Sequence, residues 1–237
     1  MKKEVLKNGT IVVTNSNFLV NSDGPLLASF ISYEHTSSLL DIGCGNGIIP
    51  LWLHDRGFTG NITALDIQNE AITLLNKSLS LNPNNRIKTV CEDLKNYTSD
   101  TKFDLVSCNP PYYDSDSSII SPNEKRKISR SSIYADINDV VLCTGRNLKE
   151  DGSFYCCIPP LRLNALRKVL CDARLSVKRL VNVRYSEEHP PWLLLLEADK
   201  KKKDTCDILS DIVVVRDCRR NCEFDDIYRM GEIYDRQ

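Results

Sequence analysis

Short apolar runs alternate with amphipathic stretches between about residues 37 and 185. Apolar runs of about five residues are typical of strands buried on both faces, whereas apolar residues spaced three and four apart indicate helices with one buried face. This alternation predicts a mainly parallel sheet with helices on both faces. The expected strands are Ser38–Ile42, Ile62–Asp66, Ile87–Cys91, Phe103–Ser107, Ser153–Ile158, Val177–Val183 and Trp192–Glu197, and the expected helices are Ile48–Asp55, Glu70–Leu81, Ile137–Leu148 and Leu161–Ala173.

The two ends of the chain depart from this repeat. We divide the sequence into an N-terminal segment, a central α/β domain and a C-terminal extension of that domain, at residues 1–36, 37–199 and 200–237. In the first part, Asp23-Gly24-Pro25 predicts the start of a short helix over Leu26–Ile31, and we expect this segment to pack on the ligand site. The extension is expected to contain a solvated loop, a strand and a short helix, at Lys200–Lys203, Ile212–Val215 and Asp225–Met230.

Composition and charge limit the classes of function. A chain of 237 residues with 41% hydrophobic and 27% charged residues can bury one sizeable core. A formal net charge of −1 does not indicate binding to nucleic acid through an overall positive field, so any such contact must be local. The longest aliphatic run late in the chain is Leu193–Leu196, too short to span a membrane, so we expect a cytoplasmic protein.

Ten cysteines raise the question of disulfides or metal. They are scattered without a Cys-x-x-Cys pair, and the nearest approach to a metal spacing, Cys206 with Cys218 and Cys222, has no histidine close by. We interpret the cysteines as reduced thiols packed like small hydrophobic side chains, which is typical of a reducing compartment. No metal site is predicted.

A glycine-rich loop follows the first predicted strand, in LLDIGCGNGII (residues 39–49). Gly43, Gly45 and Gly47 permit a tight turn and a close approach of backbone to a ligand at a helix N-terminus. Asp41 lies just before the loop, where its carboxylate favours an ammonium group over a pyrophosphate. The amine of S-adenosylmethionine is such a group, so Asp41 favours that cofactor over NAD; the alternative is a strand-ending acid beside a flexible loop.

Two further acids follow the next two predicted strands. Asp66 ends the second strand, where a carboxylate accepts hydrogen bonds from both ribose hydroxyls of an adenosine moiety. Asp93 follows the third strand and can accept from the adenine amino group, although an acid at such a position, taken alone, is more often a loop or cap residue. Because ligands bind at the carboxyl ends of strands in open α/β sheets, we assign Asp66 and Asp93 to the cofactor site.

The fourth predicted strand is followed by CNPPYYD (residues 108–114). A simple turn is one interpretation, since Asn-Pro starts turns and proline fixes φ. The other is a rigid clamp for a planar amine, in which the Asn109 side-chain oxygen and the Pro110 carbonyl each accept one N–H and point the nitrogen lone pair at a methyl donor. Tyr112 then offers a face on which a flipped base stacks.

These motifs resemble those of the class I S-adenosylmethionine-dependent methyltransferases that act on amino groups. Within that class, the chain from about Asp23 to Glu197 looks like the bacterial tRNA-valine adenine N6-methyltransferases, through SDGPLLASF, DIGCGNGIIPL, NPPYY, NEKRKISR, DGSFYCCIPPLRL and PPWLLLLEA. The resemblance implies a Rossmann-like fold with a seven-stranded sheet, methylation of an adenosine beside the anticodon of tRNA, and the cofactor and base contacts assigned above. We expect the enzyme to act as a monomer.

A cluster of basic residues lies shortly after the clamp and is a candidate for local RNA contact. Its members are Lys125, Arg126, Lys127 and Arg130. They can bind phosphates that flank a flipped nucleotide, although a solvated basic face is the alternative.

Other functions fit parts of the pattern. A protein glutamine N5-methyltransferase shares the loop and the clamp but usually carries a longer helical N-terminal domain, and a DNA adenine methyltransferase needs a target-recognition insertion that is not visible. A catalytically idle RNA-binding protein would not need Asp41, Asp66 and Asn109 together. An NAD-dependent dehydrogenase would need an acid–base histidine, and none stands in the right region.

Overall fold

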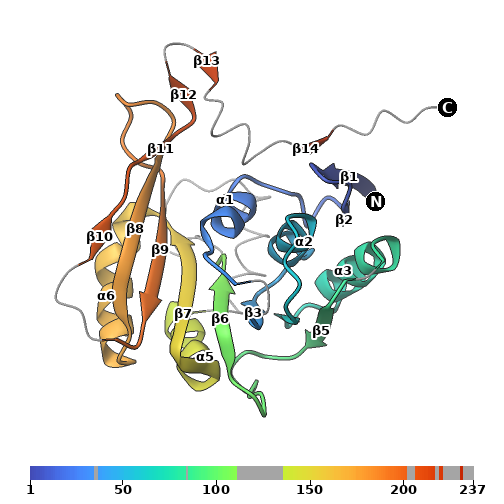
Figure 1. Cartoon of the computed structure of the whole chain (residues 1–237), viewed down its shortest axis with the longest axis horizontal. Coiled ribbons are helices and arrows are strands. Elements are labelled where there is room, and N and C mark those ends of the chain that lie inside the picture. The colour runs from blue at the N-terminus through green and yellow to red at the C-terminus, as the bar shows by residue number, and fades with distance from the viewer. Residues whose placement is uncertain are drawn as a thin grey trace, which may run out of the picture.

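A computed structural model describes residues 1–34, 37–83, 85–110, 136–201, 206–216, 219–220 and 230–231. Its centre is one large sheet, in which the seven main strands follow the order β5-β4-β3-β6-β7-β9-β8 (Figure 1). Neighbours from β5 to β7 are parallel, and β9 runs antiparallel to both β7 and β8. The strands are β3 (Leu39–Ile42), β4 (Ile62–Asp66), β5 (Ile87–Cys91), β6 (Phe103–Cys108), β7 (Leu148–Ile158), β8 (Ser176–Arg184) and β9 (Leu193–Asp199). The seven predicted strands are therefore confirmed.

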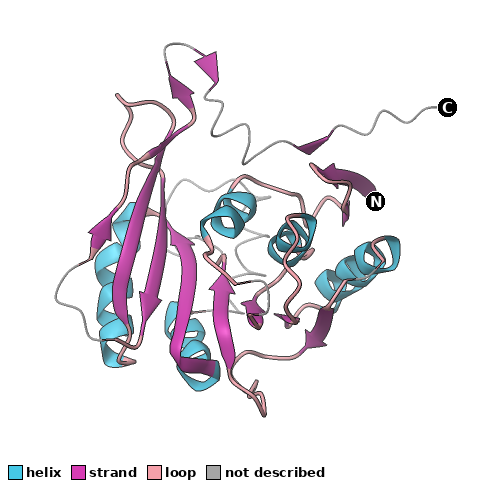
Figure 2. Ribbon diagram, in the orientation of Figure 1, coloured by secondary structure: helices cyan, strands magenta, loops and turns pink. Residues whose placement is uncertain are grey.

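Helices cover both faces of this sheet, as the apolar runs predict (Figure 2). One face packs on α1 (Asp23–Phe30), α2 (Ile48–Asp55) and α3 (Asn69–Leu81), and the other on α5 (Ile137–Asn147) and α6 (Leu163–Asp172). Alternate residues of β7 divide between the two cores, with Tyr155 and Cys157 on the α1 side and Phe154 and Cys156 on the α5 side. A strand buried on both faces needs apolar residues at nearly every position, which is why the strands read as continuous runs.

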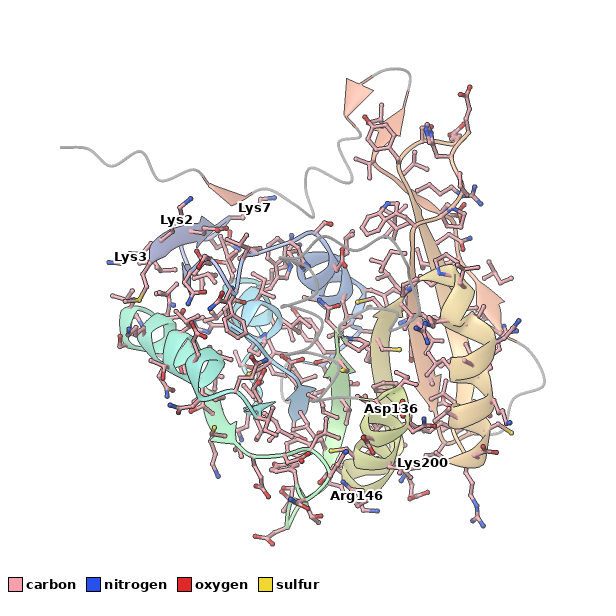
Figure 3. The ribbon with its side chains drawn as sticks, turned by 180° about the vertical axis from the view of Figure 1, so that it is seen from behind. Lys2, Lys3, Lys7, Asp136, Arg146 and Lys200 are labelled. Carbon is pink, nitrogen blue, oxygen red and sulfur yellow. The ribbon has the colours of Figure 1, made fainter. Side chains whose placement is uncertain are left out.

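Element boundaries differ from the predictions where a turn leads directly into an element. Strand β7 begins at Leu148 rather than Ser153, because Leu148 is fully buried and pairs with Phe103. The predicted helix after Ile158 starts as a 3₁₀ turn, Pro160–Arg162, before α6. Figure 3 marks the two ends of α5: Asp136 caps its first turn, and Arg146 near its end donates to the Leu94 carbonyl at 2.8 Å.

An N-terminal hairpin was not predicted. Strands β1 (Lys2–Leu6) and β2 (Ile11–Thr14) pair antiparallel around the turn at Gly9, which has φ 101°. The backbone of β2 is held to α3, since Ser78 Oγ accepts from Val13 N at 2.9 Å and the Asn82 side chain bonds both backbone groups of Ile11. Exposed side chains of β1 and the following turn point outward from this hairpin (Figure 3), at Lys2, Lys3 and Lys7.

The C-terminal extension also departs from the prediction. Strands β10 (Asp207–Ile208) and β11 (Ile212–Val213) add to the outer edge of β8, β12 (Val215–Arg216) pairs with β13 (Arg219–Arg220), and β14 (Met230–Gly231) pairs with β1. The predicted strand Ile212–Val215 is thus divided between β11 and β12 at Val214. The predicted helix at Asp225–Met230 is wrong at Met230, which pairs in a strand; residues 225–229 lie outside the described part.

Lys200, predicted to start a solvated loop, is instead half-buried. Its Nζ donates to the Leu148 carbonyl and pairs with Glu150, both at 2.9 Å, whereas Lys202 and Lys203 lie outside the described residues. Across the described ranges, no helix has both the length and the apolar character needed to cross a membrane.

Candidate active site

The loop between β3 and α2 is shaped by three glycines with positive φ. Gly43, Gly45 and Gly47 have φ of 69°, 56° and 81°, in the left-handed region that side chains with a Cβ rarely adopt. The Gly43 and Cys44 amides donate to the Leu65 carbonyl at 2.8 and 3.0 Å, which ties the loop to the end of β4. The loop therefore has a fixed conformation at the carboxyl edge of the sheet.

The glycines nevertheless serve different purposes. A Cβ on Gly43 would meet nothing within 4 Å, and one on Gly45 would stand 3.7 Å from the Phe18 ring. A Cβ on Gly47 would lie 2.3 Å from Leu75 Cδ1, so Gly47 is needed for α3 to pack against the loop. Open space for a ligand thus lies at Gly43, and the cofactor contacts of Gly43, Gly45 and Gly47 stay predictions.

Asp41, on β3 just before the loop, is almost fully buried, with 1% of its surface exposed. Its Oδ1 accepts a hydrogen bond from Ser107 Oγ at 2.6 Å, while its Oδ2 is buried and has no hydrogen-bond partner in the described part of the chain. Burial raises the pKa of Asp41 to about 7; the Ser107 bond opposes this rise, and the nearby charge of Asp66 adds to it. A buried carboxylate oxygen without a donor is suited to a cationic ligand.

Asp66 is also buried, but both of its oxygens have partners. Oδ2 accepts from the Gly45 amide at 2.9 Å and Oδ1 from the Gln68 amide at 2.8 Å. Burial raises the pKa of this carboxyl, against the lowering effect of these backbone donors. Each carboxylate oxygen can accept a second bond, so the orientation is set while capacity remains for two hydroxyl donors.

Asp93, assigned to the cofactor's adenine, caps a turn after β5. Its Oδ1 accepts from the Lys95 amide at 2.9 Å, and its backbone carbonyl accepts from the Asn96 and Tyr97 amides. This geometry is that of the cap residue weighed as an alternative. The adenine contact stays a prediction.

Asn109 and Pro110 follow β6 directly, at the same edge as the glycine loop. Cys108, the last residue of β6, pairs with Ile42 on β3 and with Cys156 on β7. Pro110 is buried, and the Asn109 side chain is half-buried with its Oδ1 accepting from Cys157 Sγ at 3.2 Å. The parallel register therefore brings the predicted amine clamp next to the predicted cofactor loop.

The remaining predicted site residues lie outside the described part of the chain. They are Tyr112, Lys125, Arg126, Lys127 and Arg130. Their roles stay predictions.

Two residues that contact the site were not predicted from the sequence. Ser107 and Cys157 hold the side chains of Asp41 and Asn109, respectively. Alternation along a strand puts Ser107 and Asn109 on one face, so Ser107 was within reach of inference. Cys157 requires the register between β6 and β7, which no local signal gives.

A polar groove of about 510 Å³ lies at the opposite, amino-terminal end of β6 and β7. The buried Glu197 carboxylate at its wall is bound by Lys178 Nζ at 2.6 Å, by Arg179 Nε and by Ser153 Oγ at 3.1 Å. Asp104 pairs with Lys149 at 2.7 Å. The charges of Glu197 and Asp104 in this groove are matched by cations, which indicates a structural role for these two acids. In the described part of the chain, no group of three or more acids, cysteines or histidines is placed to hold a metal, and none of the eight described cysteines forms a disulfide.

Comparisons with known proteins agree with this arrangement. The family model of the methyltransferase small domain matches residues 16–122, which include the glycine loop and the clamp. Among solved structures, a predicted O-methyltransferase from Agrobacterium tumefaciens superimposes with a TM-score of 0.70 at 16% identity, over 86% of this chain and 94% of that chain. At this identity the likeness concerns the fold, and it confirms the predicted class I methyltransferase architecture.

Curated relatives identify the family. The tRNA1(Val) (adenine(37)-N6)-methyltransferase of Flavobacteriaceae bacterium strain 3519-10 is 28% identical over 203 residues, 85% of this chain and 86% of the relative. The enzyme of the same name from Parabacteroides distasonis is 30% identical over 181 residues, which cover 75% of each chain. These matches confirm the resemblance, the enzyme class and the dependence on S-adenosylmethionine predicted from the sequence. The chain belongs to the bacterial tRNA1(Val) (adenine(37)-N6)-methyltransferase family.

Proposed function

We propose that this protein transfers a methyl group from S-adenosylmethionine to the exocyclic N6 amine of adenine 37, beside the anticodon of a valine tRNA. The observation that carries the proposal is the parallel register of β3 and β6, which pairs Ile42 with Cys108 and so brings the Asn109-Pro110 clamp beside the loop at Gly43. The names of the family members supply the substrate.

The residues at this edge fit the cofactor. The unpartnered Oδ2 of Asp41 can accept from the ammonium group, the space at Gly43 admits a ligand against the backbone, and the fixed carboxylate of Asp66 can accept from the ribose hydroxyls. When bound, S-adenosylmethionine supplies a methyl group on a sulfonium, which is a good leaving group. The protein's own task is therefore to orient the nucleophile.

Asn109 and Pro110 perform that task. Asn109 Oδ1 and the Pro110 carbonyl each accept one N–H of the adenine amine, so its lone pair leaves conjugation with the ring and points along the attack line. Pro110 is buried and its φ is fixed by its ring, so this acceptor moves little. Methyl transfer forms the N–C bond while the methyl–sulfur bond breaks and leaves a neutral thioether, and the resulting cationic amine loses its proton to water without a dedicated base. Tyr112 provides the stacking face, and Lys125, Arg126, Lys127 and Arg130 bind the flanking phosphates.

The test is methyl transfer to unmodified tRNA, with the product located by nuclease digestion and mass spectrometry. Asn109→Ala should lower kcat by about 100-fold or more, because the attack line is lost, while the Kd for S-adenosylmethionine stays within about twofold of the wild type. Asn61→Ala serves as the matched control, because Asn61 is exposed and directly precedes β4, at the amino-terminal edge of the sheet and away from the clamp.

One result would overturn the assignment of substrate. Label that appears on a release-factor glutamine, and in no tRNA, would identify the protein as a glutamine N5-methyltransferase instead. Both substrates present a planar amine, so the clamp alone does not separate them.

A further inference from the structure

A cysteine on β7 contacts the clamp from the side. Cys108 pairs with Cys156, so the residues that follow them, Asn109 and Cys157, stand next to each other across β6 and β7. Cys157 Sγ donates to Asn109 Oδ1 at 3.2 Å, and Cys157 is fully buried in the core on the α1 side. A buried thiol usually acts as a small hydrophobic group. A thiol that forms a hydrogen bond with the predicted catalytic amide therefore indicates a role beyond packing.

We propose that Cys157 is a positioning residue for methyl transfer, whose thiol fixes the orientation of the Asn109 amide. The proposal rests on the proposed function of Asn109. An asparagine amide turns about its last bond and then exchanges its oxygen for its NH2 group. In the exchanged state a donor would face the donor N–H of adenine, and the amine would be left without one acceptor.

The contact with Cys157 favours the productive state. A thiol proton bonds the amide oxygen better than it bonds the NH2 group, so the oxygen stays in place before the substrate arrives. An amide oxygen accepts two hydrogen bonds, so the same atom has the capacity to accept the adenine N–H as well. Orientation that is set in advance lowers the cost of reaching the attack geometry.

The experiment replaces the thiol by groups of similar size. Cys157→Val removes the donor and adds one methyl group, whereas Cys157→Ser keeps a donor in nearly the same shape. The matched control is Cys156→Val, because Cys156 directly precedes Cys157, is equally buried and faces the α5 side of the sheet. Each variant is assayed for kcat and KM with tRNA, for the Kd of S-adenosylmethionine and for Tm.

Cys157→Val should lower kcat by about three- to tenfold, the range expected for one weak neutral hydrogen bond, with the cofactor Kd unchanged. Cys157→Ser should retain kcat within about twofold, and Cys156→Val should match the wild type in kcat despite a comparable change in Tm. Equal kcat losses in the serine and valine variants of Cys157, or in Cys157→Val and Cys156→Val, would overturn the proposal.

A second measurement does not depend on the substrate. In a double-mutant cycle with Asn109→Ala and Cys157→Val, the effects on the folding equilibrium constant should deviate from their product by about twofold or more. Effects that simply multiply would show that the contact is absent and would overturn the role of Cys157 alone. Wild-type protein that forms no N6-methyladenosine in any tRNA would instead overturn the proposed function, and the role of Cys157 with it.

Discussion

Two carboxylates of this protein stand in one row across the sheet and have opposite surroundings. From β3 to β9, consecutive partners in the row are Asp41, Ser107, Tyr155 and Glu197. Asp41 and Glu197 are each only 1% exposed. Glu197 binds two cations and a hydroxyl, whereas Asp41 has one hydroxyl and, in the described part of the chain, no partner for its second oxygen.

The pKa values of the two groups move apart accordingly. Burial raises the pKa of Glu197, but hydrogen bonds from Lys178 and Arg179 outweigh it and hold that pKa below its usual value. Burial raises the pKa of Asp41 to about 7, because Ser107 alone does not offset it. A buried acid whose charge is matched within the protein stabilises the fold, whereas one whose charge is unmatched is available to a ligand.

The largest effect is expected from breaking the matched site. Glu197→Ala leaves Lys178 and Arg179 without their anion and should lower the free energy of unfolding by about 3 kcal/mol, at the low end for a buried pair. The low end applies because the two cationic side chains are 32% and 23% exposed and regain water. Urea unfolding measures this. As a control, Glu150→Ala removes an acid that is 82% exposed in its pair with Lys200 and should leave the free energy of unfolding nearly unchanged.

Asp41→Asn should affect binding instead of folding. Loss of the charge-assisted bond to the ammonium group should raise the Kd of S-adenosylmethionine by about 30-fold, or about 2 kcal/mol. At pH 8 the free energy of unfolding of the free variant should be at least that of the wild type, because an unmatched buried charge has been removed. Calorimetric titration and urea unfolding give the two quantities. A loss of stability as large as that of Glu197→Ala would show that Asp41 has a structural role, and it would contradict the distinction between the two acids.

The next effect is on pH dependence, and the two acids should show opposite signs. Asp41 must be ionised to bind the ammonium group, and its pKa in the free protein is about 7. The Kd for the cofactor should therefore be about eightfold higher at pH 6 than at pH 7.5. Since the folded pKa of Asp41 lies above its unfolded value, its contribution to stability is fully present below about pH 4 and is lost as pH rises through 7. The contribution of Glu197, whose folded pKa is lowered, is present above the unfolded value and is lost as pH falls. Asp41→Asn should abolish the pH dependence of the Kd below pH 7.5, and a Kd that does not vary with pH in the wild type would contradict the role of Asp41.

The smallest effect should come from the hydroxyl that orients Asp41. Ser107→Ala removes the bond to Asp41 Oδ1, which raises the pKa of Asp41 further and should weaken cofactor binding at pH 7.5 by about threefold. The midpoint of the pH titration should move upward with it. Ser153→Ala, which removes the corresponding hydroxyl from Glu197, should leave both the Kd and the midpoint unchanged. A shift in both variants would mean that the effect passes through the sheet rather than through Asp41.

The strands and the edge of the sheet that carries the site could be predicted because their signals are local. Each strand of the parallel sheet is a continuous apolar run, and Asp41, Asp66 and Asn109 follow such runs directly, so one rule about the carboxyl ends of strands places them together. The N-terminal hairpin also carried a local signal that went unused, since Asn8-Gly9 is the dipeptide favoured in hairpin turns. Its charged first strand, β1, lacks the apolar run by which the other strands were found.

Partner choice across strands could not be predicted, because it depends on register. The contacts of Ser107 with Asp41 and of Cys157 with Asn109 need the alignment of β3, β6 and β7 to within one residue. The pairing of Glu197 with Lys178 and Arg179 likewise depends on an irregular register between Val177 and Arg179 on β8. A sequence read one element at a time does not contain this information.

The close approach of Leu75 to Gly47 has a consequence for mutagenesis of the glycine motif. An alanine scan across residues 43, 45 and 47 places each new side chain on a backbone with positive φ, so every variant carries backbone strain, and at Gly47 the added carbon also collides with the Leu75 side chain. Loss of activity in a Gly47 variant would therefore combine loop strain with repacking around Leu75, and thermal-shift data taken alongside would be needed to separate both from weaker capture of the methyl donor.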